Sequence, residues 1–416
     1  MTSFSDITTI GVGGPIARFV EPRTRVAFIE AVEDADEHGL PLCVIGGGSN
    51  MLASDEPFPG VVVRDARRLI TVPDEAAPVE GDDRTVHINA EAGANWDDLV
   101  AFSVQIGLEG IEGLSGIPGT VGASVVQNIG AYGQEVATTV ESVEVWDRQD
   151  KVTRDLVPDD LRFGYRTSAL KASMYAAPGV PADRFFPTPR YVVLSVTFAL
   201  RHSATGVVGF GQLAKALGVE VGERMATTAI RETVLKVRAS KGMLEDPTRY
   251  ANPAMAGTKR ENNVLADLKR LAEANPDAGF DESGLPKSDA DRHSCGSFFM
   301  NPILTSVQAD RLPEEAPRFD APLPDGAPGI KTSAAWLIDH AGFSKGYAIG
   351  DEFRTVASDG TDDRPRASLS TRHTLALTNR GGATAADVVA LAHRIQRGVH
   401  DAYGVDLVPE PVWIGL

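Results

Sequence analysis

The sequence predicts an α+β protein with two or three domains. Its 416 residues are 43% hydrophobic, which is enough to build more than one sizeable core. Strand-like segments dominate the first half of the chain, and the longest helical pattern lies near its end. Eight glycines lie between Gly107 and Gly133, at every third position as far as Gly122, a spacing that an ordinary helix or strand does not tolerate. This second glycine segment (residues 107–133) indicates main chain shaped around a large ligand, with a series of plain turns as the alternative.

An α/β unit comes first along the chain. The spacing of apolar residues predicts a helix over about 25–37 that ends at Gly39, and the apolar LCVI predicts a strand that ends at Ile45. The first glycine loop (residues 46–50, GGGSN) follows this strand directly. A glycine run after a strand often binds phosphate through backbone N–H groups, so the loop is a candidate phosphate site. An ordinary turn between two strands is the alternative.

The Rossmann dinucleotide fold is excluded for the first glycine loop. Met51 stands where the third glycine of the Rossmann fingerprint should be. Pro57 and Pro59 leave no room for the long helix that must follow. Phosphate binding therefore remains possible, but with a different topology.

Strands and helices divide the rest of the chain. A helix is expected from about Met225 to Arg238, and another over 384–403 that opens with the capping box Thr384 to Asp387 and stops at Gly404. The polar stretch 246–292 is interpreted as a surface insertion with one possible helix, NNVLADLKRLAEA. Strand patterns before residue 205 predict an α+β second module, with strands at 61–65, 86–93, 140–147 and 190–200.

Charge and composition limit the possible partners. A net charge of −17 repels nucleic acid and anionic membrane surfaces. There is no leader pattern and no stretch of about 18 apolar residues, which predicts a cytoplasmic protein. Cys43 and Cys295 form no CxxC pair, as expected in a reducing compartment. The eight histidines are scattered, so no metal site is expected.

Seven motifs together resemble one family, the UDP-N-acetylenolpyruvoylglucosamine reductases. Each is weak alone, but their order and spacing match over nearly the whole chain apart from 246–292. The motifs are TTIGVGG (8–14), IGGGSNML (45–52), GLSGIPGTVGASVVQNIGAYGQE (113–135), FGYRTS (163–168), GSFFMNP (296–302), AAWLIDHAGFSKG (334–346) and PEPVWIG (409–415).

The resemblance implies a flavoenzyme of peptidoglycan precursor synthesis, with a two-module FAD-binding domain of the vanillyl-alcohol-oxidase-like type and a C-terminal α/β substrate-binding domain. On this view module 1 spans 1–70 and is completed by 405–416, and module 2 spans 71–205. The substrate-binding domain spans 206–404 and carries the insertion at about 246–292.

The same resemblance implies where FAD binds. The pyrophosphate is expected against the backbone of the first glycine loop and of residues 116–122, where neutral N–H groups need no lysine. Four more residues are expected near the flavin. The implied FAD contacts are Gly46, Gly47, Gly48, Ser49, Asn50, Gly116, Ile117, Pro118, Gly119, Gly122, Ala123, Gln127, Asn128, Gly130 and Ala131.

The implied reaction has two halves. NADPH reduces the flavin, which then reduces the enolpyruvyl ether of UDP-N-acetylglucosamine enolpyruvate to UDP-N-acetylmuramate. Arg166 and Glu410 match the family residues that stabilise the developing enolate, and Glu410 can do so only if it is protonated. Ser297 matches the proton donor. Without the resemblance, these three would be interpreted as a surface ion pair, a solvated carboxylate and a turn serine.

Residues for the nucleotide sugar follow less directly. Arg238 and Lys241 close the predicted helix beside Gly242, where they can face a diphosphate, and Tyr165, Asn301 and His373 are further candidates. Family members with a longer clamping loop carry a tyrosine where this chain has Phe210. A monomer is expected. Two alternatives remain open: another flavin oxidoreductase of the same architecture, and a nucleotide-sugar sensor that has lost catalysis.

Overall fold

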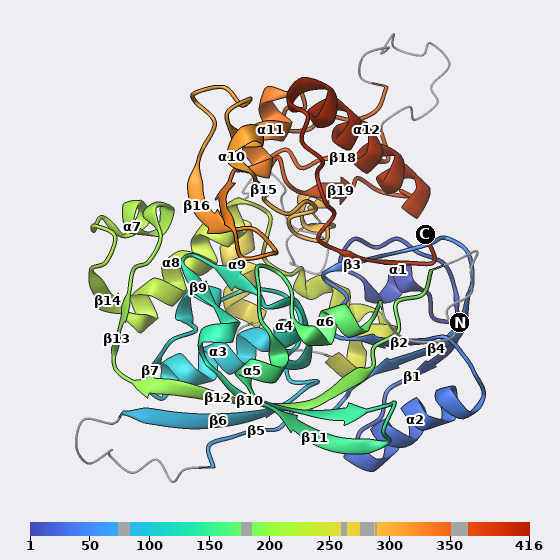
Figure 1. Cartoon of the computed structure of the whole chain (residues 1–416). Helices are drawn as coiled ribbons and strands as arrows, with labels where there is room; N and C mark the ends of the chain where they lie inside the picture. The colour runs from blue at the N-terminus through green and yellow to red at the C-terminus, as the bar shows by residue number, and fades with distance from the viewer. Residues whose placement is uncertain (74–83, 176–184, 259–263, 275–286, 288, 351–364) are drawn as a thin grey trace.

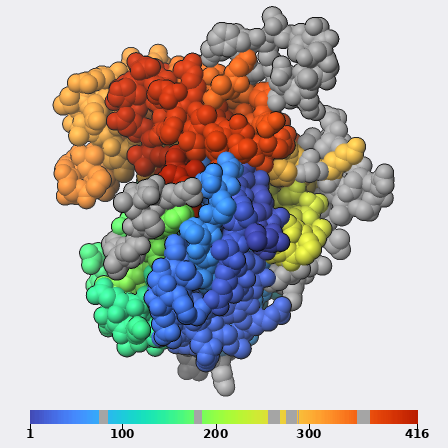
Figure 2. Space-filling model, turned by 90° about the vertical axis from the view of Figure 1, so that its right-hand side faces the viewer, coloured from blue at the N-terminus to red at the C-terminus, as the bar shows by residue number. Residues whose placement is uncertain are grey.

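The computed structural model stacks a C-terminal part on an N-terminal part that holds a six-stranded sheet and a parallel three-stranded sheet. In Figure 1 these sheets lie at the bottom in blue to green, and the C-terminal part lies above them in orange and red. Figure 2 shows the same stacking from the side. No helix in the described ranges is long and apolar enough to cross a bilayer. The structure describes residues 1–73, 84–175, 185–258, 264–274, 287, 289–350 and 365–416.

The first module is a three-stranded parallel sheet covered by one helix. Strands β1 (Ile16–Val20), β4 (Phe58–Arg64) and β2 (Leu42–Ile45) pair in the order β1-β4-β2. Helix α2 (Arg25–Glu37) packs Phe28 and Val32 on this sheet, and the Thr24 hydroxyl caps its start. The predicted helix and the predicted strand end at Ile45 are both confirmed. Strand β3 (Met51–Ala53) follows the first glycine loop instead of a helix, as the exclusion of a Rossmann fold requires.

The last strand of the chain returns to the first module. Strand β20 (Val412–Ile414) pairs in parallel with β3, with Val412 opposite Met51. Ile414 lies in the same core as Phe4 and Ile16. Helix α1 (Phe4–Ile7) also contributes to this core. The pairing holds the flank of the first glycine loop beside residues 409–411.

A larger sheet forms the second module. The predicted strand 140–147 has the observed bounds, and the predicted strands 86–93 and 190–200 lie within two residues of the observed bounds at each end. The predicted strand 61–65 falls on β4, which begins three residues earlier and belongs to the sheet of the first module. Helices α3 (Trp96–Gln105) and α4 (Val121–Gln127) share the core of this sheet with Trp96 and Phe198. The strand order is β11-β10-β12-β6-β5, with β7 paired to β12, and the bounds are β5 (Ile70–Thr71), β6 (Thr85–Glu91), β7 (Leu108–Glu109), β10 (Val140–Asp147), β11 (Val152–Leu156) and β12 (Tyr191–His202).

Helix α4 lies inside the second glycine segment. The prediction that no helix forms in this segment is therefore wrong for residues 121–127. Gly122 permits it, because a Cβ at this position would lie 2.8 Å from the Cβ of Ala92. The glycine thus lets the helix approach the chain that leaves β6. Short elements surround α4: η1 (Glu112–Leu114), β8 (Gly130–Ala131), β9 (Gln134–Glu135), η2 (Val136–Thr138), α5 (Pro158–Leu161) and α6 (Ala169–Ser173).

The third part contains half of the α-helices that the structure describes, and its core also takes in Ile10, Val12 and Leu52 of the first module. Helix α12 (Ala385–Tyr403) begins with the predicted capping box of Thr384 and Asp387 and ends at Gly404, whose φ is +65°. Helix α8 (Thr227–Ser240) is also close to its predicted range. The remaining elements are β13 (Thr205–Val207), α7 (Gly211–Leu217), β14 (Arg224–Ala226), β15 (Ile303–Leu304), α10 (Ser306–Ala309), β16 (Phe319–Pro322), β17 (Pro328–Lys331), α11 (Ala334–His340), β18 (Ala367–Leu369) and β19 (Leu377–Asn379).

The stretch 246–292 is not simply a surface insertion, and that prediction is wrong for its first part. Met255 is 1% exposed and packs in the core of the first module. The expected helix is present as α9 (Val264–Ala274), which contacts α8. The other described elements are η3 (Pro247–Ala251), η4 (Pro253–Thr258) and η6 (Ala290–Arg292), and residues 259–263, 275–286 and 288 lie outside the described residues.

Candidate active site

Two adjoining cavities lie where the modules meet. The space in them, open solvent at the mouth included, is about 900 and about 830 Å³. The first is lined by the first glycine loop and by residues of both N-terminal modules. The second reaches the catalytic candidates Arg166, Ser297 and Glu410. Residues that line both cavities are Ser49, Asn50, Thr120, Ala123 and Gln127.

The first glycine loop presents unused donors to this space. Its carbonyls are engaged, since Gly48 O accepts from Thr9 N at 2.9 Å and Gly47 O accepts from Arg249 at 3.1 Å. Within the described part of the chain, the amides of residues 47–50 donate no hydrogen bond. Among the residues that the structure describes, no lysine or arginine lines the first cavity. Neutral, convergent N–H groups of this kind suit a pyrophosphate, so the residues present fit the FAD that the sequence implied.

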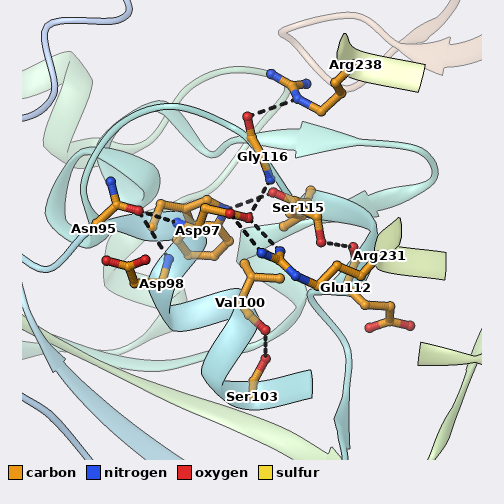
Figure 3. A network of polar contacts seen from close by, with 12 residues as sticks. Asn95, Asp97, Asp98, Val100, Ser103, Glu112, Ser115, Gly116, Arg231 and Arg238 are labelled. Carbon is orange, nitrogen blue, oxygen red and sulfur yellow. Dashed lines mark hydrogen bonds and ion pairs between the residues drawn. The ribbon is translucent and has the colours of Figure 1, made fainter. Parts of the chain in front are cut away.

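A buried polar network holds the second glycine segment (Figure 3). Asp97, 2% exposed, accepts the amide of Gly116 at 2.6 Å. Arg231 on α8 forms a two-pronged ion pair with the same carboxylate, at 2.6 and 2.9 Å. Arg238, about two turns further along α8, donates to the Gly116 carbonyl at 3.0 Å. The N–H group of Gly116 is therefore linked to α8 through Asp97, and its carbonyl is bonded to α8 directly.

Several amides of the second glycine segment are thus unavailable to a ligand. The amide of Gly116 is used by Asp97, and those of Val121 and Gly122 donate to the carbonyls of Ala94 and Ala92, each at 2.9 Å. The expected pyrophosphate contacts along 116–122 lack donors at these three positions. Ile117, Pro118, Gly119 and Ala123 line the second cavity.

Arg166 is held at the tip of a tight turn. Residues 164–167 close through paired bonds between Gly164 and Thr167, and Arg166 has a φ of +56°. Such left-handed backbone is strained for a residue with a Cβ and occurs often at functional sites. Its guanidinium donates to the carbonyls of Gly130, at 2.5 Å, and Asn128, at 3.4 Å. The Nε atom lies 3.3 Å from Glu410 Oε1.

Glu410 is a largely buried carboxyl with donors around its Oε1 atom. Gln127 Nε2 donates to its Oε1 at 3.0 Å. Lys171 Nζ donates to Gln127 Oε1 at 2.7 Å and to the backbone carbonyl of Glu410 at 3.2 Å. Burial raises the pKa of Glu410, while Arg166, Gln127 and Lys171 oppose that shift. The carboxyl can therefore hold a proton at a pH where an exposed glutamate is ionised.

Ser297 is brought to Glu410 by pairing of two distant segments. Phe299 forms an antiparallel bridge with Pro409, and Glu410 N donates to Phe298 O at 2.9 Å. This register sets the residue before Phe298 beside the residues around Glu410. Ser297, Arg166 and Glu410 all line the second cavity.

The candidates for the nucleotide sugar lie around this corner but do not all line the cavity. Tyr165 lies between Arg166 and Lys331, whose charged groups are 5.3 and 5.0 Å from its ring centroid. Asn301 hydrogen-bonds to Tyr165, and its Oδ1 accepts from Ala334 N at 2.9 Å. These contacts fix the position of the Tyr165 ring.

A cationic cluster contains the other three candidates. Burial, together with Lys241, Lys345 and Arg238, lowers the pKa of His373 to about 4. Burial and the same neighbouring cations also lower the pKa of Lys241, which donates to Gln212. A neutral histidine among three cations is an arrangement suited to an anion. Across the described ranges, no group of three or more His, Cys, Asp or Glu side chains could hold a metal ion.

Sequence reasoning missed several residues of the site. Lys171, Asp97, Arg231 and Lys345 are ordinary charged residues in the sequence, and only their contacts distinguish them. For Lys171 a signal was available, since it lies on the short helix α6 that the motif residue Ser168 caps.

Phe210 is 45% exposed and contacts Tyr132 edge-on at 6.0 Å between ring centroids.

Comparisons with known proteins agree with this arrangement. A family model described as an FAD binding domain matches residues 16–155. A model described as the C-terminal domain of UDP-N-acetylenolpyruvoylglucosamine reductase matches residues 287–414. A protein of Thermobifida fusca (strain YX) with the name UDP-N-acetylenolpyruvoylglucosamine reductase is 38% identical, covering 99% of this chain and 96% of the relative. A relative of the same name from Streptomyces coelicolor is 39% identical, covering 99% of this chain and 88% of its own length.

A solved structure supports the fold. The UDP-N-acetylenolpyruvylglucosamine reductase of Thermus caldophilus superposes with a TM-score of 0.53 at 24% identity, covering 99% of this chain and 97% of that one. The predicted fold class, an FAD-binding domain with a further C-terminal domain, is confirmed, and so is FAD as the cofactor. Identity near 40% along almost the entire length shows that the chain belongs to the UDP-N-acetylenolpyruvoylglucosamine reductase family.

Proposed function

We propose that this protein reduces UDP-N-acetylglucosamine enolpyruvate to UDP-N-acetylmuramate with NADPH as the electron donor, in peptidoglycan precursor synthesis. Bound FAD would supply the hydride transfer, from NADPH to the methylene carbon of the enolpyruvyl group. The observation that carries the proposal is that Arg166, Ser297 and Glu410 line one cavity together with Ser49 and Asn50 of the first glycine loop. Family membership supports the same assignment.

Arg166 and Glu410 would stabilise the charge that develops on the substrate. Hydride addition at the methylene carbon leaves negative charge on the neighbouring carbon, shared with the substrate carboxylate. A guanidinium supplies a cation and donors, and a protonated carboxyl supplies a further donor. The buried surroundings of Glu410 and the rigid turn that carries Arg166 support these roles.

Ser297 would then protonate the carbon. Its hydroxyl proton moves to the substrate carbanion, and a C–H bond forms as the O–H bond breaks. A serine hydroxyl is a weak acid, so the step depends on a strongly basic carbanion and on position. The pairing of Phe298 and Phe299 with 409–410 supports that position, since it keeps the serine next to Glu410.

The nucleotide diphosphate would lie toward the cationic cluster of Arg238, Lys241, Lys345 and His373, with Tyr165 and Asn301 on the side of Arg166. We assign FAD binding to residues 1–70 and 71–205, closed by 405–416, and substrate binding to 206–404. We propose a cytoplasmic monomer that binds small molecules, and the charge of −17 disfavours nucleic acid as a partner.

Stopped-flow absorbance of the flavin tests the proposal, because it follows each half-reaction separately. NADPH should bleach the flavin, and the enolpyruvyl nucleotide should restore its colour. Ser297→Ala should still be reduced by NADPH at the parent rate, but reoxidation should collapse. Ser297→Cys should keep part of the activity, since a thiol is the stronger acid. Reoxidation of the alanine variant at the parent rate would place the proton donor elsewhere.

Arg166→Ala tests the cation at the substrate carboxylate. One donor that acts in the transition state is worth roughly 3–4 kcal/mol, so turnover should fall by two to three orders of magnitude. FAD content should remain unchanged. Arg166→Lys is the matched control, because it keeps the charge and loses the planar fork that reaches Gly130 and Glu410.

A further inference from the structure

The two oxygens of Glu410 differ in their surroundings. Oε1 accepts a hydrogen bond from Gln127 and forms the ion pair with Arg166. Within the described part of the chain, Oε2 has no hydrogen-bond partner. The side chain is 14% exposed and lines the second cavity. Oε1 is thus committed to protein donors, and Oε2 is the oxygen available to a ligand.

Lys171 determines which end of the Gln127 amide meets Glu410. An ammonium group can only donate, so the amide oxygen must face Lys171, at 2.7 Å. The amide nitrogen, which can only donate, then faces Glu410 Oε1. Without a donor on the lysine side, either orientation of the amide would be possible. The orientation of Gln127 thus follows from the lysine charge.

We propose that Lys171 is a positioning residue which, through Gln127, keeps the proton of Glu410 on Oε2, the oxygen that faces the cavity. A proton on Oε1 would point at the N–H donor of Gln127 and at the Arg166 guanidinium, so it is excluded from that oxygen. The proton on Oε2 can be donated to a bound carboxylate. This inference rests on the proposed function, in which Glu410 acts as a protonated carboxyl.

The charges around Glu410 are consistent with this role. Three groups face the carboxyl: Arg166 from the turn 164–167, Lys171 from α6 and the phenol of Tyr165 beside Arg166. Both cations favour the ionised form of Glu410, and burial opposes them. Lys171 is itself largely buried, and its two printed contacts are with Gln127 and with the Glu410 backbone. It therefore acts through Gln127 rather than on substrate.

Infrared difference spectroscopy of the flavin-loaded protein tests the proton position directly. In the parent protein the carboxyl C=O is Oε1, which accepts strong donors, so its stretching band should lie at low frequency. In Lys171→Met the amide of Gln127 can turn its oxygen toward Glu410, the proton should move to Oε1, and the C=O band should shift to higher frequency. Glu410→Gln identifies the band by removing it.

Kinetics supply a second readout. In Lys171→Met the loss of a cation should move the alkaline midpoint of flavin reoxidation to higher pH, while the reoxidation rate falls by roughly tenfold. A purely structural defect would lower the rate without raising the midpoint. Reduction by NADPH should be unaffected. Lys171→Arg keeps a cationic donor and should restore both the infrared band and the midpoint.

Two further variants complete the test. Lys215→Met changes an exposed lysine on α7 and should alter nothing. Gln127→Met removes the donor from Oε1 and should give the same band shift even where Lys171→Met is unstable. An unshifted band in both Lys171→Met and Gln127→Met overturns the proposal. Parent protein that bleaches with NADPH but fails to reoxidise with the enolpyruvyl nucleotide contradicts the proposed function instead, and leaves the infrared result on Glu410 intact.

Discussion

The two glycine-rich regions use the same residue for different purposes. In the first glycine loop the carbonyls are engaged by the protein and the amides of 47–50 are left for a ligand. In the second glycine segment the amides of Gly116, Val121 and Gly122 are engaged by the protein. A run of glycines therefore does not identify a ligand cradle by itself; the direction of the hydrogen bonds does.

The two regions should also differ in what they control, FAD affinity or folding stability. The first glycine loop should influence FAD affinity more than folding. The second glycine segment joins the sheet of the second module to α8 through a buried ion pair, and should influence folding more than affinity. Substitutions in the two regions, each with a control elsewhere, test this difference.

The largest effect is expected from Asp97→Ala. It removes the partner of Arg231, whose side chain is 11% exposed, and the acceptor of the Gly116 amide. An unpaired buried charge costs about 3–5 kcal/mol, and the free energy of unfolding should fall by that amount. Urea denaturation followed by circular dichroism measures it. Asp155→Ala, on an exposed position of β11, is the control and should change stability little. Parent stability in Asp97→Ala would show that the network is dispensable.

Gly48→Ala should come next, and should act mainly on FAD. Gly48 has a φ of +66°, and a Cβ there would lie 2.2 Å from the carbonyl oxygen of Ile7. The strain should cost about 2–3 kcal/mol and displace the loop amides, so the Kd for FAD should rise by at least tenfold. Titration of apoprotein with FAD gives the Kd. Gly211→Ala is the matched control, since a Cβ there meets nothing within 4 Å. Equal Kd values for FAD in Gly48→Ala and Gly211→Ala would show that the first glycine loop does not control FAD affinity.

Arg249→Lys should have a smaller effect on the same loop. Arg249 belongs to the stretch 246–292 and donates to the carbonyls of Ile7 and Gly47 at 3.0 and 3.1 Å. Lysine keeps a charge for Glu245 but loses the fork, at a cost of about 1–2 kcal/mol. A modest rise in the FAD Kd should accompany it. Arg154→Lys, at a half-exposed position, serves as control. An unchanged Kd would mean that the stretch 246–292 contributes packing alone.

The smallest effect is expected on the pH dependence of stability, from His373, which lies near the Arg238 that bonds to Gly116. The pKa of His373 is lowered to about 4, so the folded protein binds this proton less tightly than the unfolded chain, whose value is near 6.5. The contribution of neutral His373 to the free energy of unfolding is therefore complete above pH 6.5 and is lost as pH falls toward 4. Protonation of His373 would place a further positive charge near Arg238. His373→Gln should reduce this loss by about 1 kcal/mol, allowing for solvent screening. Denaturation at pH 7 and pH 5 measures it; identical pH dependence in both proteins would contradict it.

Local patterns account for what the sequence could predict. Helix α2 and strand β2 were predictable to the residue or nearly so, because an amphipathic helix with a Thr24 cap and a short apolar run are both local signals. The capping box of α12 is local too. Arg166, Ser297 and Glu410 were found through motifs that resemble a family, since none of the three has a distinctive neighbourhood in sequence.

Long-range contacts account for the features that the sequence could not predict. The amide donors of the second glycine segment look free in the sequence, and only the carbonyls of Ala92 and Ala94 show that they are used. Lys171 donates a hydrogen bond to the backbone carbonyl of Glu410, which is far away in the sequence. Met255 lies in a polar stretch that composition assigns to the surface, but its side chain packs in the core of the first module. Pairing between distant segments is invisible to a local pattern.

The parallel pairing of β20 with β3 bears on how the protein is made. Strand β3 leaves the ribosome early, whereas β20 is synthesised after the second and third parts of the chain. The edge of β3 therefore stays unpaired through most of synthesis, and contacts so distant in sequence form slowly. An unpaired strand edge invites aggregation. Folding of the FAD site should consequently be a late event, completed only when Val412–Ile414 reaches β3 and brings Glu410 into place.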